Sequence, residues 1–497
     1  MSELSDDLKK ICEIVGEGNY STDPMDILCY SRDLAPVPEE MLKGYGMIEP
    51  SLIVKPQNIE QVASILKYAR EKDIIITPRG GGSFALGGTI PMEGGVVVDL
   101  CAMNEIVDFN ETDEYIRVQC GMSWRRLVEW LEPRGWTVGA NASSGTSATI
   151  GGYIGTGGGA GIGVPKHGPL GNQIISMKVV LPNGDIIETN PWNSWTFIGA
   201  EGTLGIVCEV TLKVFRLQEQ RFYMYGFDTL FDGIRALRRI AALKPYFLHF
   251  FDRGGINFLR RAGEEELREA AVTLVVLMRG SAAEVDAADK MLNDICRGAY
   301  RYPEDAVLEE WEGRYKVELR FKRLGPTLML QEIRLPMSRL EAALEDLSKA
   351  LKKEDWGIQS LSSDQENICL LVYALSDERD KLRFLKSLSL ARTIPGVGYK
   401  HGGTVYGIGL HNSAHLTRLH GHRAVAFMKR MKAQFDPNAI LNPSKTVVKR
   451  IPGFVVEGAM LTMQQAPWLM RLGLGIAAQI PQGLIRMGLK VVGGKLR

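Results

Sequence analysis

The sequence predicts an α+β protein of two or three domains. Its 497 residues suffice for that number of domains of ordinary size. The 54 glycines are concentrated before residue 210, which favours loops with special backbone geometry, and glycines return in 396–416. From about residue 219 strand-like and helix-like runs alternate instead, which is typical of an α+β domain.

The chain before residue 219 is expected to form short strands, helices and glycine-rich loops. An amphipathic helix is predicted at 58–70, where Asn58 and Gln61 resemble a capping box. A second helix is predicted after Ser123, and a tight glycine turn followed by a strand is predicted at 197–214. Strands are predicted at 74–77, 96–99, 115–120, 177–181 and 185–189, the last two joined by a Pro-Asn-Gly hairpin turn.

The rest of the chain is expected to be more regular until the glycines return. Strands are predicted at 222–227, 272–278, 329–335 and 368–375, and helices at 229–243, 282–293, 337–352 and 377–391. After residue 416 a long helix is predicted to end near 435, because Asp436-Pro437 follows it, and 439–445 is expected to be a turn.

Two glycine-rich stretches, 77-TPRGGGSFALGG-88 and 143-SSGTSATIGGYIGTGGGAG-161, are the most informative part of the sequence. The pattern at 80–85 matches a dinucleotide-binding fingerprint, which works only where the glycine turn opens a helix. Further glycines and Pro91 follow directly, and the match at 155–160 is followed in the same way. We therefore expect that neither stretch leads into a helix, and we reject the Rossmann interpretation.

Such loops can bind phosphate without a helix, because successive glycines let several N–H groups converge on one anion. With Arg79 supplying a guanidinium, two loops of this kind suit a diphosphate that carries two nucleoside-like arms. The alternative is that both stretches are flexible surface loops. The apolar residues within them, such as Phe84 and Ile154, count against that alternative.

Composition excludes several classes of protein. Lysine plus arginine (59) nearly balances aspartate plus glutamate (58), so no basic surface for nucleic acid is indicated. The seven cysteines form no C-x-x-C pair, which argues against an iron–sulfur or zinc site within the chain and fits a reducing cytoplasm. The first residues are polar and acidic, unlike a signal peptide, and no run of about eighteen apolar residues occurs.

Residues 451–497 differ from the rest of the chain. They combine apolar residues with several basic ones between glycine and proline breaks, and Glu457 is their only acidic residue. This basic apolar tail has three interpretations: peripheral contact with a membrane surface, packing on a partner subunit, or wrapping around its own domain.

Four motifs occur in a fixed order: 50-PSLIVKPQNIEQVASILKYAREKDIIITPRGGGSFALGG-88, 147-SATIGGYIGTGGG-159, 200-AEGTLGIVCEV-210 and 436-DPNAILNP-443. Together they resemble the FAD-linked oxidases of the vanillyl-alcohol oxidase / p-cresol methylhydroxylase fold, in the branch of glycolate oxidase and D-lactate dehydrogenase. The resemblance covers roughly 45–450. It implies a two-part FAD-binding domain, 1–218 (core motif region 46–218) and 396–450, with an inserted α+β substrate cap domain at 219–395 and the tail at 451–497.

The resemblance also assigns residues to FAD. The first loop would hold the pyrophosphate through Pro78, Arg79, Gly80, Gly81, Gly82, Ser83 and Phe84, with Gly88 beside it. The second would follow the other side of the cofactor through Ser144, Gly145, Ser147, Ala148, Thr149, Gly151, Gly152 and Ile154. Gly202, Gly205, Ile206 and Val207 would contact the adenine end, and Asn442 would lie near the flavin ring. Some members bind FAD through a histidine where this chain has Ser83, and 121–207 has no cysteine, so non-covalent FAD is expected.

The chain departs from the family at its substrate site. Hydroxy-acid enzymes of this kind carry a GHxGDGNxH motif whose histidines bind a metal ion. The matching stretch here, 361-LSSDQENICL-370, keeps Asn367 but has Ser362 and Cys369 in place of the histidines. No metal is therefore expected. A GEHGIG motif is replaced by 403-GTVYGIGL-410, which puts Tyr406 where a histidine would lie close to the flavin.

The candidate catalytic residues are Tyr406, His401, Arg314 and His411. Arg314 resembles the arginine that binds the substrate carboxylate, and Arg320 and Arg323 are nearby alternatives. Tyr406 would need a strongly lowered pKa to act as a base. His411 and His415 have the i, i+4 spacing of a metal pair, but no third ligand lies close in sequence.

The resemblance predicts an FAD-dependent dehydrogenase that oxidises a small 2-hydroxy acid or related alcohol by hydride transfer to flavin N5. Electrons would pass to a separate acceptor, with an iron–sulfur subunit as the expected partner, in an oligomer or complex in the cytoplasm or at the membrane periphery. Two alternatives stay open: an aromatic-alcohol or phenol oxidase of the same fold, and an FAD-carrying electron-transfer or scaffold subunit without its own substrate.

Overall fold

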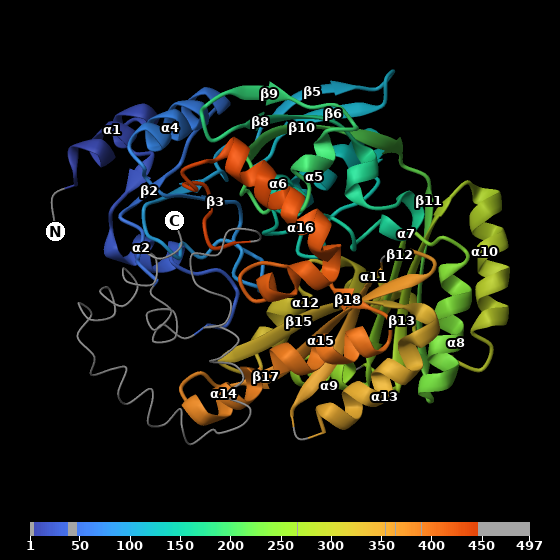
Figure 1. Cartoon of the computed structure of the whole chain (residues 1–497). Helices are drawn as coiled ribbons and strands as arrows, with labels where there is room; N and C mark the ends of the chain where they lie inside the picture. Colours follow the sequence, from blue (N-terminus) through green and yellow to red (C-terminus); the bar gives the residue numbers. More distant parts are fainter. Residues whose placement is uncertain are drawn as a thin grey trace.

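The computed structural model describes residues 4–37, 47–265, 267–352, 354–362, 364–388 and 390–445, and these residues form three sheets. Two smaller sheets come from the first half of the chain, and a larger sheet follows them (Figure 1). The predicted tail, 451–497, lies outside the described residues. Among the helices that are described, none has the length and apolar character needed to cross a bilayer.

The first sheet has four strands in the order β1 (Tyr20–Ser21), β2 (Leu52–Val54), β4 (Val96–Asp99) and β3 (Ile76–Arg79). Strands β2 and β3 both run parallel to β4. The helices of this part are α1 (Asp6–Val15), α2 (Pro24–Tyr30) and α4 (Ile59–Glu71). The predicted helix at 58–70 is therefore confirmed as α4, and the side chain of its N-cap, Asn58, accepts from the Gln61 amide. Strand β3 begins two residues later than predicted and carries the chain into the first glycine loop.

The second sheet is antiparallel, in the order β5 (Ile106–Asn110), β6 (Tyr115–Gln119), β10 (Ile206–Arg216), β8 (Ile174–Val180) and β9 (Ile186–Glu188), with β7 (Trp136–Val138) paired to β10. Its helices are α5 (Trp124–Leu131), α6 (Ile150–Gly155) and α7 (Val164–His167).

Helix α6 corrects the expectation that neither glycine stretch leads into a helix. Thr149 caps α6, and its hydroxyl accepts from the Gly152 amide. The apolar residues Ile150 and Ile154 are fully buried, so burial of these side chains outweighs the low helix propensity of the glycines between them. The first stretch agrees with the expectation, since no helix follows β3 before β4.

The third sheet has eight strands in the order β14 (Tyr300–Arg301), β11 (Glu219–Phe227), β13 (Val272–Gly280), β12 (Phe247–Asp252), β16 (Trp356–Ser362), β17 (Asn367–Ser376), β15 (Thr327–Pro336) and β18 (Thr404–Val405). All pairs along it are antiparallel. We call it the cap sheet. The four predicted strands of this region are confirmed, whereas β12 and β16 were not predicted.

Helices cover the outer face of the cap sheet. They are α8 (Leu230–Ala241), α10 (Ala282–Ile295), α13 (Leu340–Ala350), α14 (Lys381–Leu388) and α15 (Leu390–Lys400), and Figure 1 shows α8, α10 and α13 along one side. The predicted helix at 377–391 is thus two helices, and the second continues to Lys400. The inner face packs on α9 (Arg253–Arg261), α11 (Glu304–Gly313), α12 (Val317–Lys322) and the segment at 160–162. Short 3₁₀ turns lie at Glu132–Arg134, Leu170–Gln173, Ser194–Thr196, Met337–Arg339 and Ser413–His415.

The last described helix, α16 (Leu416–Phe435), brings the chain back to the first two sheets (Figure 1). It ends at Phe435 with Asp436 as its C-cap, as predicted, and it has a kink at Gly421, which was not predicted. Leu441 then forms a bridge with Ile76 of β3. The buried ammonium of Lys432 joins these parts, because it pairs with Asp436 and donates to the carbonyls of Thr203 (2.6 Å) and Leu441 (2.8 Å).

We predict that Lys432→Met destabilises the protein by about 3 to 5 kcal/mol, because it leaves the Asp436 carboxylate buried without its cation. Lys429→Met, at an exposed position on the same helix, serves as the control and should change stability by less than about 0.5 kcal/mol. Urea unfolding monitored by circular dichroism measures both. Equal stability of the two variants would show that Lys432 does not hold the C-terminal part in place.

Candidate active site

A cavity of about 1320 Å³, partly open to solvent, lies between the glycine-rich loops and the inner face of the cap sheet. Its walls come from the loop after β3, the segment around α6, the turn before β10, and the cap sheet. All of the predicted cofactor residues line it except Gly145, Ser147, Ile154 and Asn442. The residues of the lining that sequence reasoning did not name are Thr89, Leu100, Cys120, Ala142, Ser143, Tyr153, Gly155, Thr156, Ala160, Phe197, Glu201, Glu332, Leu361 and Gly407.

The four exceptions support the walls of the cavity from behind. Ile154 is fully buried in the core beneath α6. Gly145 lies against the ring of Tyr315, and Ser147 presents its carbonyl to the first loop. Asn442 is buried, and its amide donates to the carbonyl of Glu201 at 2.7 Å.

The first glycine loop lies so close to the neighbouring segment that only glycine fits. A Cβ on Gly80 would meet the Thr149 hydroxyl at 2.2 Å, and one on Gly81 would meet the Ser147 carbonyl oxygen at 1.8 Å. In the described part of the chain, the N–H groups of residues 80–84 donate no hydrogen bond to another protein group. These amides are therefore available to an anion, as the phosphate interpretation requires.

The second stretch contributes differently from the first. The Gly151 amide donates to the Cys120 carbonyl at 2.8 Å, and the Gly152 amide is taken up by the Thr149 hydroxyl. Because these two donors already have partners, the glycines of α6 offer close approach of the backbone rather than free amides. The first loop thus supplies amide donors to the cavity, and the glycines of the second stretch supply a wall that a ligand can approach closely.

Arg79 lines the cavity but is also held by the protein. Its guanidinium donates to the Arg32 carbonyl at 2.5 Å and to the Thr89 hydroxyl at 3.2 Å, and it stacks over the ring of Tyr30. Its positive charge therefore has a fixed place at the base of the first loop, which favours a bound diphosphate.

Two buried carboxyl groups face the cavity. Glu332 of β15 is 7 % exposed and Glu201 is 9 % exposed. Neither Oε2 atom has a hydrogen-bond partner in the described part of the chain, although the other oxygen of Glu201 accepts from the Gly409 amide at 2.7 Å. Burial raises the pKa of each to about 7, with repulsion from Glu318 adding to the shift at Glu332.

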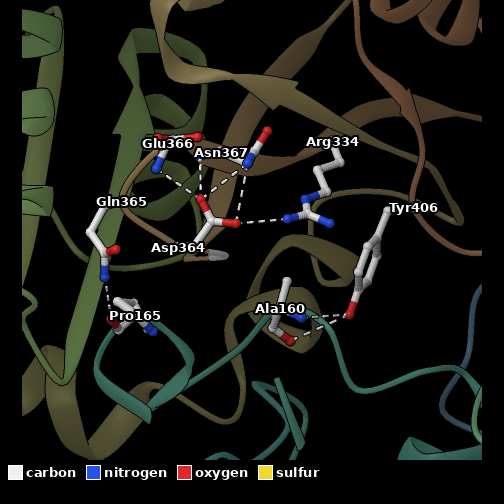
Figure 2. Close-up of polar contacts among 8 residues, drawn as sticks. All are labelled: Ala160, Pro165, Arg334, Asp364, Gln365, Glu366, Asn367 and Tyr406. Atoms are coloured by element: carbon white, nitrogen blue, oxygen red, sulfur yellow. Dashed lines mark hydrogen bonds and ion pairs between the residues drawn. The ribbon is translucent and has the colours of Figure 1, made fainter. Parts of the chain in front are cut away.

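Of the predicted catalytic residues, only Tyr406 lines the cavity. Its hydroxyl accepts from the amides of Gly159 (3.1 Å) and Ala160 (2.8 Å), as Figure 2 shows for Ala160. Burial raises the pKa of Tyr406 well above its ordinary value, so the phenol stays protonated at neutral pH. The requirement for a lowered pKa is not met, and Tyr406 is a poor candidate for the base.

The structure does not bring His401, His411 and Arg314 to the cavity wall. His401 pairs with Asp346 at 2.8 Å on the outer side of the cap. The backbone amide of His411 donates to the carbonyl of Leu86 at 3.1 Å. Burial of the His411 ring, together with the nearby charge of Lys445, lowers its pKa to about 4.

The arginines after α11 have structural partners instead of the expected free guanidinium. Arg314 stacks over Trp311 and donates to its carbonyl at 2.6 Å. Arg320 pairs with Glu310 and Glu264, and Arg323 is exposed.

The stretch that resembles a metal-binding motif forms a hairpin end organised by Asp364 (Figure 2). The Asp364 carboxylate accepts from the amides of Glu366 (2.8 Å) and Asn367 (2.6 Å), and it pairs with Arg334 at 2.7 Å. Gln365 donates to the Pro165 carbonyl at 3.1 Å and so ties the hairpin to the neighbouring domain. Cys369 is fully buried, and burial raises the pKa of its thiol well above the ordinary value.

The residues present fit FAD. Free amides and a fixed arginine meet the needs of a diphosphate, and the lining of the cavity is mostly apolar, as an isoalloxazine and an adenine require. The residue that sequence reasoning missed, Glu332, had a usable signal. It is an acidic residue in the mostly apolar strand 328-LMLQEIRLP-336, and burying such a residue is costly unless the group has a partner or a function.

The comparisons with known families agree with this fit. The FAD binding domain family matches residues 50–190, and the family of FAD linked oxidases, C-terminal domain, matches residues 216–446.

Several curated proteins are similar along most of their length. Glycolate oxidase subunit GlcD of Bacillus subtilis is 26 % identical over 90 % of this chain and 98 % of its own. D-2-hydroxyglutarate dehydrogenase of Stutzerimonas stutzeri is 26 % identical over 89 % and 98 %, respectively. The mitochondrial D-lactate dehydrogenase (cytochrome) of Arabidopsis thaliana is 26 % identical over 80 % and 73 %.

Solved structures share the fold at lower identity. p-Cresol methylhydroxylase superposes with a TM-score of 0.77 at 16 % identity, over 89 % of this chain and 96 % of its own. The 4-ethylphenol oxidase from Gulosibacter chungangensis has a TM-score of 0.75 at 15 % identity, over 90 % and 99 %. At these identities the likeness shows the fold alone. The predicted fold class, a two-part FAD-binding domain with an inserted cap, is confirmed.

We predict that Gly81→Ala lowers FAD affinity by roughly 100-fold or more, because its methyl group cannot fit against the Ser147 carbonyl and the free amides would move. Gly396→Ala, at a position with open space around it, is the matched control. FAD content after acid denaturation and FAD titration of the stripped protein measure the effect. Flavin that stays with the denatured chain would contradict the prediction of non-covalent binding.

We predict that Glu332→Gln removes a pH-dependent loss of stability. Because the folded pKa is raised to about 7 from 4.5, the wild-type carboxyl favours folding fully below pH 4.5, and this contribution is lost as pH rises through 7. The variant should match the wild type near pH 4.5 and exceed it by about 3 kcal/mol above pH 8. Urea unfolding across this pH range tests it, with the exposed Glu366→Gln as the control.

Proposed function

Because this chain is an FAD-dependent oxidoreductase that belongs to the FAD-linked oxidases, we propose that it is a dehydrogenase of a small 2-hydroxy acid or a related alcohol. One observation carries this proposal: the cavity extends from the first glycine loop to the cap sheet, where Glu332 faces it with an Oε2 that has no partner among the described residues. Bound FAD supplies the hydride acceptor for oxidation of an alcohol carbon. The protein must then orient the substrate and receive the hydroxyl proton.

The names of the similar proteins support the substrate class. The three curated relatives described above are named for glycolate, D-2-hydroxyglutarate and D-lactate, each of which is a 2-hydroxy acid. Their similarity extends over both the FAD-binding part and the cap. The absence of the two motif histidines from this chain means that the proposed oxidation depends on other residues of the cap.

We further propose that electrons leave to a separate acceptor, with an iron–sulfur subunit as the expected partner in a complex. The seven cysteines of the chain are all free thiols, and they lie in different parts of the fold. Within the described residues no three His, Cys, Asp or Glu side chains are grouped so as to hold a metal ion. The cysteines therefore support no second redox centre in this part of the chain.

Two other functions are outcomes of the same test. A phenol oxidase would need a group that pairs with the substrate phenol, but the Tyr406 hydroxyl is already engaged with backbone amides. A role as an FAD-carrying subunit without its own substrate is favoured by the loss of the motif histidines.

We predict that at least one 2-hydroxy acid bleaches the visible absorbance of the flavin under anaerobic conditions, whereas 4-alkylphenols do not. Rapid mixing of the FAD-loaded protein with a panel of both compound classes gives the measurement. Bleaching by phenols alone would replace the proposal with the phenol oxidase. Bleaching by neither class, together with rapid reduction by a purified redox partner, would indicate the FAD-carrying subunit.

A further inference from the structure

Two charged side chains stand next to each other on the cavity-facing side of β15. Successive side chains of a strand point to opposite faces, so Glu332 and Arg334 share one face. The residues between and beside them, Ile333 and Leu335, belong to the core on the other face. Glu332 lines the cavity directly.

Arg334 is not itself part of the cavity lining, but its neighbours across the sheet lead to it. It is paired across the sheet with Cys369, which is paired in turn with Leu361 of the cavity wall. On the other side it is paired with Thr404, two residues before Tyr406. Arg334 is thus two residues beyond Glu332 on the same face of the strand, and its cross-strand neighbours lead to Leu361 and Tyr406 of the cavity wall.

The guanidinium of Arg334 is held in place by one ion pair and keeps N–H donors that have no protein partner in the described residues. One of its nitrogens pairs with Asp364, whose carboxylate is itself held by the hairpin amides, as Figure 2 shows. Its side chain is 42 % exposed, and its Nε has no partner in the described part of the chain. A guanidinium has five N–H donors, so it can hold Asp364 and still bind a second carboxylate.

Glu332 differs from the other buried acids of the cap. Asp252 and Glu310 accept hydrogen bonds from amides or an arginine, which explains their burial. The Oε2 of Glu332 has no such partner in the described residues, and a Cβ on Gly407 would stand only 2.8 Å from it. Leaving this oxygen unpaired costs stability, which suggests that a ligand completes its hydrogen bonding.

We propose that Glu332 and Arg334 form the substrate end of the active site, where Arg334 binds the carboxylate of a 2-hydroxy acid and Glu332 accepts the proton of its hydroxyl group. This inference rests on the proposed function and names the residues that would perform it. Side chains two positions apart on a strand are roughly 7 Å apart at Cα. The carboxylate and the hydroxyl group of a 2-hydroxy acid are on neighbouring carbons, so Arg334 can bind the first while Glu332 contacts the second.

The atoms and electrons of this step balance. The C2–H bond of the substrate breaks, and its hydride leaves with both electrons for the FAD of the proposed function. The O–H bond breaks, its proton goes to Oε2 of Glu332, and the electron pair forms the second C–O bond. The product is a 2-oxo acid, and Glu332 then releases the proton to solvent.

The surroundings of Glu332 bring its pKa close to neutral pH. Arg334 lies on the same strand as Glu332, and the titratable groups that interact with Glu332 from other elements are Glu318, Cys369, Tyr373 and Tyr406. The last three are neutral near pH 7, because burial raises each pKa well above its ordinary value. A carboxyl group with a pKa of about 7 is both a competent base and accessible in its ionised form at neutral pH.

Binding and reduction are measured separately on the FAD-loaded protein. Oxalate, an unreactive dicarboxylate, probes the anion site through the change it causes in flavin absorbance. Arg334→Gln should weaken oxalate binding roughly 10- to 100-fold, and Arg334→Lys should restore part of it. The control Arg268→Gln replaces a cap arginine of similar exposure, 41 %, that also pairs with one carboxylate, and it should leave oxalate binding unchanged.

Glu332→Gln should lower the rate of flavin reduction without weakening the binding of the anion. Oxalate binding should be retained or strengthened, since a negative charge is removed, whereas anaerobic flavin reduction by the best hydroxy acid should slow roughly 100-fold or more. The wild-type reduction rate should rise with pH through an inflection near 7, and the variant should lack that inflection. Loss of the inflection is a result that a merely structural role would not produce.

The outcomes separate this inference from the proposed function. A wild-type flavin that no hydroxy acid reduces would overturn both. A wild type that is reduced, with Arg334→Gln binding oxalate normally or with Glu332→Gln keeping the rate and the inflection, would overturn this inference and leave the function standing.

Discussion

The contact between the first glycine loop and the backbone at 147–149 is the constraint on which the rest of the structure depends. At Gly80 and Gly81 there is no space for even one methyl group, so the loop lies directly on the neighbouring segment. The amides of residues 80–84, in the loop that lines the cavity, have no protein acceptor in the described chain. The remaining elements either hold this arrangement in place or close the cavity above it.

The C-terminal part of the chain holds the arrangement from behind. Lys432 neutralises Asp436 and donates to carbonyls from two distant segments, while Asn442 donates to the turn that carries Glu201. These are buried polar contacts, which stabilise only when every partner is present. The two-part organisation of the FAD-binding domain is thus a physical requirement, because the halves supply hydrogen-bond partners to each other.

The cap sheet closes the cavity with a face that is mostly apolar. Its low polarity is what makes the few charged groups on it informative, since a buried carboxyl shifts its pKa unless a partner compensates. Glu332 shows the shift, and its Oε2 has no partner in the part of the chain that the structure describes, while Arg320 has two carboxylate partners. The same burial that makes Glu332 available for proton transfer makes Tyr406 unavailable, because desolvation raises the pKa of an acid and of a phenol alike.

Many helices and strands were predicted from the hydrophobic periodicity of the sequence and from its capping and turn residues. Helix α4 and strand β4 are where the pattern predicted them, and Ser123 caps α5. The prediction failed where tertiary packing overrides local preference. Glycines at 151 and 152 disfavour a helix, yet α6 forms because Thr149 caps it and its apolar residues are buried. Strands β12 and β16 pair with each other although they are distant in sequence, so this pairing could not be inferred from their own residues.

The sequence by itself indicated the cofactor loop, since its run of glycines is a readable pattern, although the contact with Ser147 and Thr149 that requires Gly80 and Gly81 is tertiary. It also determined the class of fold, through the order of four motifs. Only the tertiary structure decided which charged residues face the cavity. His401 and Arg314 have suitable chemistry but turn to Asp346 and Trp311, whereas Glu332 reaches the cavity through its position on β15. The reason is that the direction and burial of a side chain depend on what the folded chain packs against it, and residue type alone does not record this.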